Sequence, residues 1–271
     1  DELNSYQISA NPLDIYLPAI ERGEFRVQLP ERSIEDAQAY AEQLLADIGI
    51  TDFACVVARI APLIPRFFDV TDGRILVNGT DIRKVKKQAL RQDIGYVPQK
   101  GVLFSGTVDS NVKYGNLNAT NKEVESAISV SQSAEFVSKL EKGINSEIAQ
   151  GGANVSGGQK QRLSIARALA VRPNIYIFDD SFSALDFKTD AALRKDLEKE
   201  TKGRTVLIVG QRISTIANAN KIIVLDEGKI VGQGTHTELL KSNKVYQEIA
   251  RSQLSDQELS STLRSGKGSK S

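Results

Sequence analysis

Hydrophobic and polar positions follow different spacings along the first sixty residues. Residues 13–20 and 24–29 alternate apolar and polar side chains, which is typical of short β-strands. Residues 34–48 instead place apolar side chains at helical spacing. Residues 53–60 (FACVVARI), which are apolar except for Arg59, then predict a buried strand. The resulting order is β-β-α-β, which indicates a small α+β unit at residues 1–62.

Farther along, a short apolar run predicts a strand of a parallel sheet. Residues 175–178 (IYIF) are apolar throughout, and this length suits the buried centre of such a sheet. Asp179 and Asp180 follow directly, at the carboxyl end where α/β sheets place ligand chemistry. We also expect 53–60 to take the place of a central strand. Ala61–Pro62 should then block a long helix, because proline and its predecessor resist helical continuation.

Composition is that of a soluble globular protein. The chain has 271 residues, of which 40% are hydrophobic and 25% charged. No apolar run approaches the ~18 residues that span a bilayer, so a membrane role must come through a partner or a deleted portion. Cys55 is the single cysteine and cannot form an internal disulfide.

Charge is distributed unevenly between the two ends of the chain. Residues 1–62 carry 11 Asp and Glu against 4 Lys and Arg, a balance of −7, which leaves +8 for the rest of a chain of net charge +1. Such asymmetry favours two segments of different origin or role. Uneven sampling of surface charges is the alternative interpretation.

Residues 155–162 (VSGGQKQR) have the character of an anion site. Ser156, Gly157 and Gly158 stand where a loop enters a predicted helix, followed by Gln159. Helix N-termini present backbone N–H donors without partners and a partial positive charge. Glycines let this backbone approach a phosphate closely. The alternative is an ordinary helix start that happens to contain two glycines.

These motifs, in the order VSGGQKQR, IYIFDD, SALD and VLIVGQR, resemble the nucleotide-binding domain of an exporter-type ABC transporter. The resemblance runs from Leu63 to about Gln253, with exporter-like stretches at 103–115, 146–159 and 226–240. It implies an α/β, P-loop-NTPase-like ABC ATPase body at residues 63–253. A helical subdomain is expected at about 105–170, the β-β-α-β unit at 1–62, and a disordered tail at 254–271.

The resemblance also implies roles for particular residues. In the family, the motif that matches Ser156, Gly157, Gly158 and Gln159 contacts ATP held by a second ABC domain. Asp179 and Gln99 match the residues that hold Mg²⁺, and Asp186 matches the loop that crosses the dimer interface. The expected partners are therefore a second ABC ATPase domain and membrane-spanning transporter domains, at the cytoplasmic side of a membrane. No nucleic acid is expected.

Three departures from the family pattern point to a degenerate site. Residues 52–67 (DFACVVARIAPLIPRF) contain neither glycine nor lysine where the phosphate loop GxxxxGK[ST] is expected. Asp180 replaces the catalytic glutamate, and the missing methylene withdraws the carboxylate by about 1.5 Å. Gln211 replaces the histidine that contacts the γ-phosphate, and glutamine cannot become cationic. The pattern resembles the degenerate half of a heterodimeric exporter.

Gly266, Lys267 and His236 are not assigned to the candidate site, and two functions stay open. Gly266 and Lys267 lack the spacing of a phosphate loop. His236, the single histidine, is expected to be a surface turn residue. The first function is a degenerate ATP-binding or ATPase domain that is inactive alone. The second is a non-catalytic chimeric binding protein that uses the ABC part as a scaffold.

Overall fold

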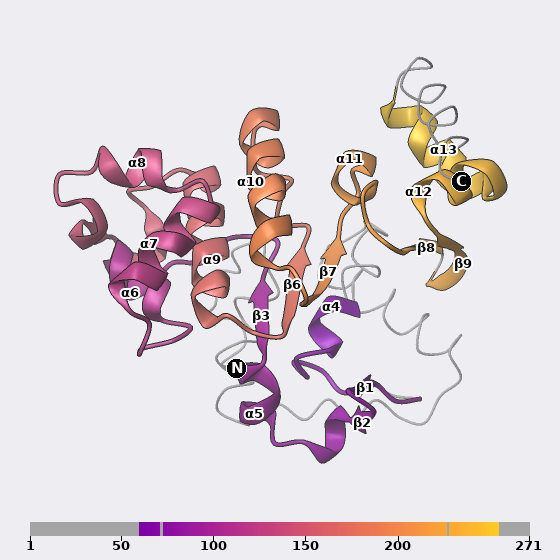
Figure 1. Ribbon diagram of the computed structural model, residues 1–271, viewed down its shortest axis with the longest axis horizontal. Helices are drawn as coiled ribbons and strands as arrows, with labels where there is room; N and C mark the ends of the chain where they lie inside the picture. Colours follow the sequence, from indigo (N-terminus) through magenta and orange to yellow (C-terminus); the bar gives the residue numbers. More distant parts are fainter. Residues whose placement is uncertain (1–59, 71–72, 227, 255–271) are drawn as a thin grey trace, which may run out of the picture.

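The computed structural model describes residues 60–70, 73–226 and 228–254 (Figure 1). The two predicted N-terminal strands and the helix at 34–48 lie outside these residues, as does nearly all of the predicted tail. The domain boundaries therefore stay predictions.

A three-stranded parallel sheet lies at the centre of the described residues (Figure 1). Its strands have the order β3-β6-β7, with Ile94 opposite Ile175 and Ile175 opposite Thr205. The strand predicted at 175–178 is confirmed, and its last four residues are buried on both faces. The strands are β3 (Ile94–Val97), β6 (Ile175–Asp179) and β7 (Thr205–Val209).

Most helices gather on the β3 side of this sheet, and α10 stands between that group and β7 (Figure 1). They share an apolar core with the sheet that includes Val97, Leu163, Ile165 and Phe178, all of them almost fully buried. The region predicted as helical subdomain contains four of these helices. The five are α6 (Val108–Lys113), α7 (Asn121–Val130), α8 (Ala134–Ser138), α9 (Gly157–Val171) and α10 (Phe187–Glu200).

The first described residues correct one prediction. Ile60, assigned to a strand, begins the helical turn α4 (Ile60–Leu63), which contains Pro62 and is only four residues long, so no long helix forms at this proline, as predicted. The N–H groups in the first turn of a helix have no internal partner, so proline costs little there. The carbonyl of Pro62 accepts a hydrogen bond from Phe67 at 3.0 Å, and Ala61 is fully buried.

Short elements connect α4 to the sheet and join the helices to one another. Two of them are antiparallel strand pairs, β1 with β2 and β4 with β5. Their bounds are β1 (Leu76–Val77), β2 (Thr80–Asp81), η2 (Ile82–Lys84), α5 (Lys87–Gln92), β4 (Gly106–Thr107), η3 (Gly143–Asn145), β5 (Glu147–Ile148) and η4 (Gln150–Gly152).

The C-terminal elements pack around a second apolar cluster, which includes Ile213, Leu239 and Tyr246. They are α11 (Ile213–Ile216), β8 (Ile222–Asp226), β9 (Lys229–Gly234), α12 (His236–Ser242) and α13 (Lys244–Gln253). His236 was expected at the surface, and this is wrong. It is only 8% exposed, because as the first residue of α12 its ring packs against Tyr246, whose hydroxyl lies 2.7 Å from Nδ1.

A cavity of about 1250 Å³ separates β7 from β8. Among the described residues, β7 pairs only with β6 and β8 only with β9. Apolar side chains from both strands line the space, including Val206, Ile208 and Ile223.

None of the helices in the described ranges combines the length and apolar character that crossing a bilayer requires.

Candidate functional site

The helix start predicted at Ser156 is confirmed as the N-terminus of α9, and its role as an anion site stays a prediction. Ser156 has an extended backbone and caps the helix, with its Oγ accepting from the N–H of Gln159 at 3.3 Å. The side chain of Gln159 returns the bond, accepting from the N–H of Ser156 at 2.9 Å. This reciprocal capping box satisfies two donors at the helix start. The first-turn N–H groups of Gly157 and Gly158 point out of the helix without an internal partner.

The two glycines have different surroundings. A Cβ on Gly157 would meet no atom within 4 Å, whereas a Cβ on Gly158 would lie 3.4 Å from the carbonyl oxygen of Ala184. Gly157 therefore faces open space, and Gly158 lies against the loop that contains Ser183–Asp186. The structure thus brings the start of α9 next to the predicted dimer-interface loop.

Asp179, at the carboxyl end of β6, is 4% exposed. Its Oδ2 accepts a hydrogen bond from the hydroxyl of Tyr96 at 2.8 Å. Burial raises the pKa of the Asp179 carboxyl above its usual value, with the charge of Asp180 adding to the effect and the Tyr96 bond opposing it. Burial also raises the pKa of Tyr96, so its hydroxyl stays protonated and donates.

Asp180 occupies a left-handed backbone conformation with φ at +44°. Non-glycine residues adopt this region seldom, and aspartate tolerates it better than most. Its N–H donates to the carbonyl of Val209 at 2.8 Å, and its Oδ2 accepts from Nε2 of Gln99 at 3.2 Å. Burial raises the pKa of Asp180, while the Gln99 bond opposes the rise. Gln99, Asp179 and Asp180 therefore meet at one edge of the sheet.

The loop that carries Gln99 is held against α9. Nε2 of the buried Gln161 donates to the carbonyl of Pro98 at 3.0 Å, and Arg167 donates to the carbonyl of Val102 at 2.9 Å. A Cβ on Gly101 would lie 2.7 Å from the backbone of Lys160, so only glycine permits this approach. The loop of Gln99 is therefore packed directly against the helix that begins at Ser156.

Gln211 and Asp186 complete the predicted set. Gln211 follows β7 and is exposed, and the carbonyl of this residue accepts a bond from Nε2 of Gln253 at 2.8 Å. Asp186 caps α10 by accepting from the N–H of Thr189 at 2.9 Å, and this backbone bond lowers the pKa of the Asp186 carboxyl. The structure gives Asp186 a structural role as a helix cap, and its role at a dimer interface stays a prediction.

Sequence reasoning missed several residues that shape this site. Tyr96 binds Asp179, Gln161 holds the loop of Gln99, and the buried Ser181 donates to the carbonyl of Val97 at 2.9 Å. Gln161 offered a signal, since a polar residue between buried helical positions usually has a partner. Tyr96 offered a weaker one, because its place within β3 does not reveal which residue its hydroxyl meets.

The donor set fits Mg²⁺ in chemical type. This ion prefers oxygen ligands and is commonly held by one or two carboxylates together with substrate phosphates. Asp179 and Asp180 supply carboxylates at one edge, and Gln99 supplies an amide next to them. In the described part of the chain, no group of three or more His, Cys, Asp or Glu could hold a metal ion by itself. An ion here would therefore draw its remaining ligands from a nucleotide and water.

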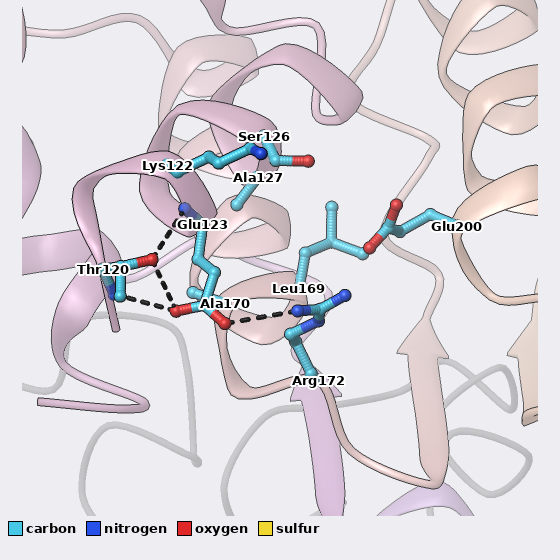
Figure 2. A pocket seen from close by; sticks show the side chains of 9 residues that line it. All are labelled: Thr120, Lys122, Glu123, Ser126, Ala127, Leu169, Ala170, Arg172 and Glu200. Carbon is cyan, nitrogen blue, oxygen red and sulfur yellow. Dashed lines mark hydrogen bonds and ion pairs between the residues drawn. The ribbon is translucent and has the colours of Figure 1, made fainter. Parts of the chain in front are cut away.

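A separate hollow of about 400 Å³ lies at the other end of α9 (Figure 2). Figure 2 shows the side chain of Glu123 extending toward Arg172, while Glu200 lies on the opposite side of the hollow. Glu123 accepts from Arg172 at 3.2 Å, and its other oxygen accepts from the N–H of Thr120 at 2.8 Å. These groups neutralise each other, so the hollow offers no free charge from Glu123 and Arg172, and it contains none of the predicted site residues.

Known proteins similar to this chain share the same region. A family model described as ABC transporter matches residues 59–183. An "uncharacterized ABC transporter ATP-binding protein" of Mycobacterium tuberculosis is 47% identical over 199 residues, covering 72% of this chain and 34% of that protein. An ATP-dependent lipid A-core flippase of Desulfotalea psychrophila is 42% identical over 185 residues, covering 68% of this chain and 32% of the flippase.

Among solved structures, a bacterial Atm1-family ABC exporter with ATP bound is similar, with a TM-score of 0.68 and 39% identity. The match covers 70% of this chain and 34% of the exporter chain. The chain thus spans about a third of the length of these relatives. The predicted α/β ABC ATPase body is confirmed by this likeness and by the sheet with its flanking helices. Through the region that begins at residue 59, this chain belongs to the ABC transporter family as a nucleotide-binding domain related to those of exporters.

Proposed function

We propose that this chain is a degenerate exporter-type ATP-binding domain that acts on ATP held by a second ABC domain. The observation that carries the proposal is the open face of Gly157 at the capped start of α9. Backbone donors and the helix dipole converge there, and no side chain of the motif obstructs an approaching phosphate. Such a surface serves a nucleotide that another chain presents.

The chain's own ATP site is the weak one in this proposal. Residues 52–67 have no glycine or lysine to form a phosphate loop. Asp180 is one methylene shorter than glutamate and its Oδ2 is already engaged by Gln99. Gln211 is exposed and cannot carry the charge of a histidinium. Hydrolysis by the isolated chain is therefore not expected.

ATP and Mg²⁺ are the ligands that domains of this family generally bind. In this proposal Asp179 and Gln99 hold Mg²⁺, which neutralises phosphate charge when bound. Asp179 is fixed for that role by Tyr96, and Gln99 by the packing of its loop on α9.

The partners in this proposal are a second ABC domain and membrane-spanning domains. The support is the likeness to an exporter solved with ATP bound and to a lipid A-core flippase, of which this chain matches about a third. A chain docked on such partners would lie at the cytoplasmic side of the membrane. Asp186, in the loop beside Gly158, would then lie near the contact between the two ABC domains.

One observation favours the alternative, a non-catalytic chimeric scaffold. The capping box of Ser156 and Gln159 satisfies two of the donors at the helix start without any ligand. The motif could then serve as an ordinary helix start, with the acidic N-terminal segment carrying the function.

Substitutions at Gly157 separate these two functions. Aspartate at the first turn favours the helix dipole, so Gly157→Asp should not destabilise α9, yet its charge repels a phosphate. Gly157→Ala adds a methyl to open space and is the matched control. The full chain is mixed with an ABC domain that has an intact phosphate loop and glutamate, and the ATPase rate of that domain is measured.

The proposal predicts that wild type and Gly157→Ala raise the partner's rate and that Gly157→Asp does not. Equal rates with all three chains, or no stimulation by wild type, would contradict it and favour the scaffold.

A further inference from the structure

We infer that Gln253, on the C-terminal helix α13, is a positioning residue for the turn at residues 211–214 and, through Arg212, for the loop at 183–186. The inference goes beyond the proposed function, since it assigns a role to α13. It rests on contacts among described residues, and only its consequence for a partner's ATP depends on the proposed function.

Both polar atoms of the Gln253 amide bind the backbone of this turn. Nε2 donates to the carbonyl of Gln211 at 2.8 Å, and Oε1 accepts from the N–H of Ile213 at 2.8 Å. The two bonds lie on either side of Arg212, so they fix the backbone from which its side chain extends. A bidentate grip of this kind sets orientation as well as distance.

Gln253 also supplies a cap that the turn cannot supply for itself. Ile213 is the first residue of α11, and its N-cap Arg212 makes no side-chain cap bond. First-turn N–H groups need an outside acceptor, which usually comes from the N-cap side chain. Here the acceptor comes from a residue 40 positions away in the sequence.

The other side of the turn is held by α10. Arg194 donates to the carbonyl of Ser214 and forms an ion pair of 2.9 Å with Asp190, which is only 2% exposed. The turn is therefore held between two helices, α10 and α13.

Arg212 connects the turn to the candidate site. Its Nη2 donates to the carbonyl of Ser183 at 3.2 Å, and the next carbonyl, of Ala184, lies 3.4 Å from the Cβ position of Gly158. Its positive charge also acts on Asp180, whose pKa it lowers against the dominant effect of burial. A contiguous series of contacts thus joins Gln253 to the start of α9.

Spatial continuity alone does not demonstrate coupling, so the test must detect transmission. Gln253→Leu removes both bonds, and Gln253→Glu keeps the acceptor for Ile213 but loses the donor. Gln247→Leu is the matched control, because Gln247 lies on the same helix and donates to the carbonyl of Leu240 at 2.9 Å. Arg212→Leu breaks the series one step later.

Amide hydrogen exchange of the full-length chain is the primary measurement. Gln253→Leu should accelerate exchange at least tenfold at Ile213 and measurably at 183–185, while Gln253→Glu protects Ile213 nearly as wild type does. Arg212→Leu should accelerate 183–185 and leave Ile213 protected. Gln247→Leu should change neither region.

Acceleration at Ile213 without any change at 183–185 would make Gln253 a cap only and overturn the inference. Unchanged exchange at Ile213 in Gln253→Leu would overturn it as well. In the mixture with an intact ABC domain, Gln253→Leu should reduce stimulation more than Gln247→Leu. If wild type gives no stimulation, the proposed function fails, and the exchange data still decide the positioning role.

Discussion

Nε2 of Gln99 donates a hydrogen bond to Oδ2 of Asp180 across 3.2 Å, although the two residues are 81 positions apart. The predicted metal ligand and the predicted base are therefore in contact. Asp180 has a left-handed backbone that is anchored to Val209. Its carboxylate therefore cannot move far enough to make up for the length of the missing methylene. Its side chain is set as an acceptor for Gln99.

We predict that repairing the two substituted residues does not restore hydrolysis. The double variant Asp180→Glu with Gln211→His restores the catalytic glutamate and the histidine that contacts the γ-phosphate. It leaves residues 52–67 without glycine or lysine to bind the phosphates. Phosphate release by the purified chain should stay at background. Turnover by the double variant alone would show that the phosphate grip lies elsewhere in the chain.

Binding of Mg-ATP to the isolated chain should be about a thousandfold weaker than to an intact ABC domain. The missing loop would supply several charge-assisted hydrogen bonds of roughly 1.5–3 kcal/mol each, and losing two of them has this effect on affinity. Calorimetry of both proteins in one buffer provides the comparison. Micromolar binding by this chain would refute the prediction.

Asp179→Asn should stabilise the protein at neutral pH. Burial raises the pKa of Asp179 in the folded state, so its contribution to stability is present at low pH and is lost as the pH rises through the folded pKa. Asparagine can still accept the Tyr96 bond without carrying a charge. We expect a gain of roughly 0.5–2 kcal/mol at pH 7, the usual range for a stabilising change, and a smaller gain at pH 4.5.

Urea unfolding at both pH values measures this gain, and Asp186→Asn is the control. Hydrogen bonding lowers the pKa of Asp186, so neutralising it should give no gain at pH 7. An equal gain for both variants would mean that general charge reduction, and not burial of Asp179, is responsible.

His236 should make the fold sensitive to mild acid. Burial lowers its pKa, so the unfolded chain takes up a proton first as the pH falls below about 6.5. Stability then falls with pH, by at most about 1.4 kcal/mol per unit from this one group. The difference in unfolding free energy between wild type and His236→Gln, measured from pH 7.5 to 5, isolates the contribution of His236 to this pH dependence. A difference that does not change with pH would contradict the assignment.

The sequence predicted local features better than contacts between distant residues. The apolar run before Asp179 was sufficient to place β6, and the glycines after Ser156 were sufficient to place the start of α9. Ile60 was misjudged, because the apolar run that predicted a strand continues into the short helical turn α4. His236 was misjudged because its burial depends on Tyr246.

Contacts across the chain had no local signal. Tyr96 meets Asp179 across 83 positions, and Gln253 meets Ile213 across 40, so neither bond follows from spacing or propensity. These contacts appear only when strands and helices are assembled. The N-terminal strands and helix predicted before residue 60, and the domain boundaries, stay predictions.

The space between β7 and β8 has a consequence for the solubility of the protein. Within the described residues two strand edges face this space, with Val206 39% and Ile223 52% exposed, and such edges can recruit strands of other molecules. The charged residues of the lining are mostly basic, and they include Lys195, Lys202, Arg204 and Lys221 beside one acid, Glu198. Positive charges beside an open edge repel a second copy, so high salt, which screens them, favours self-association during purification.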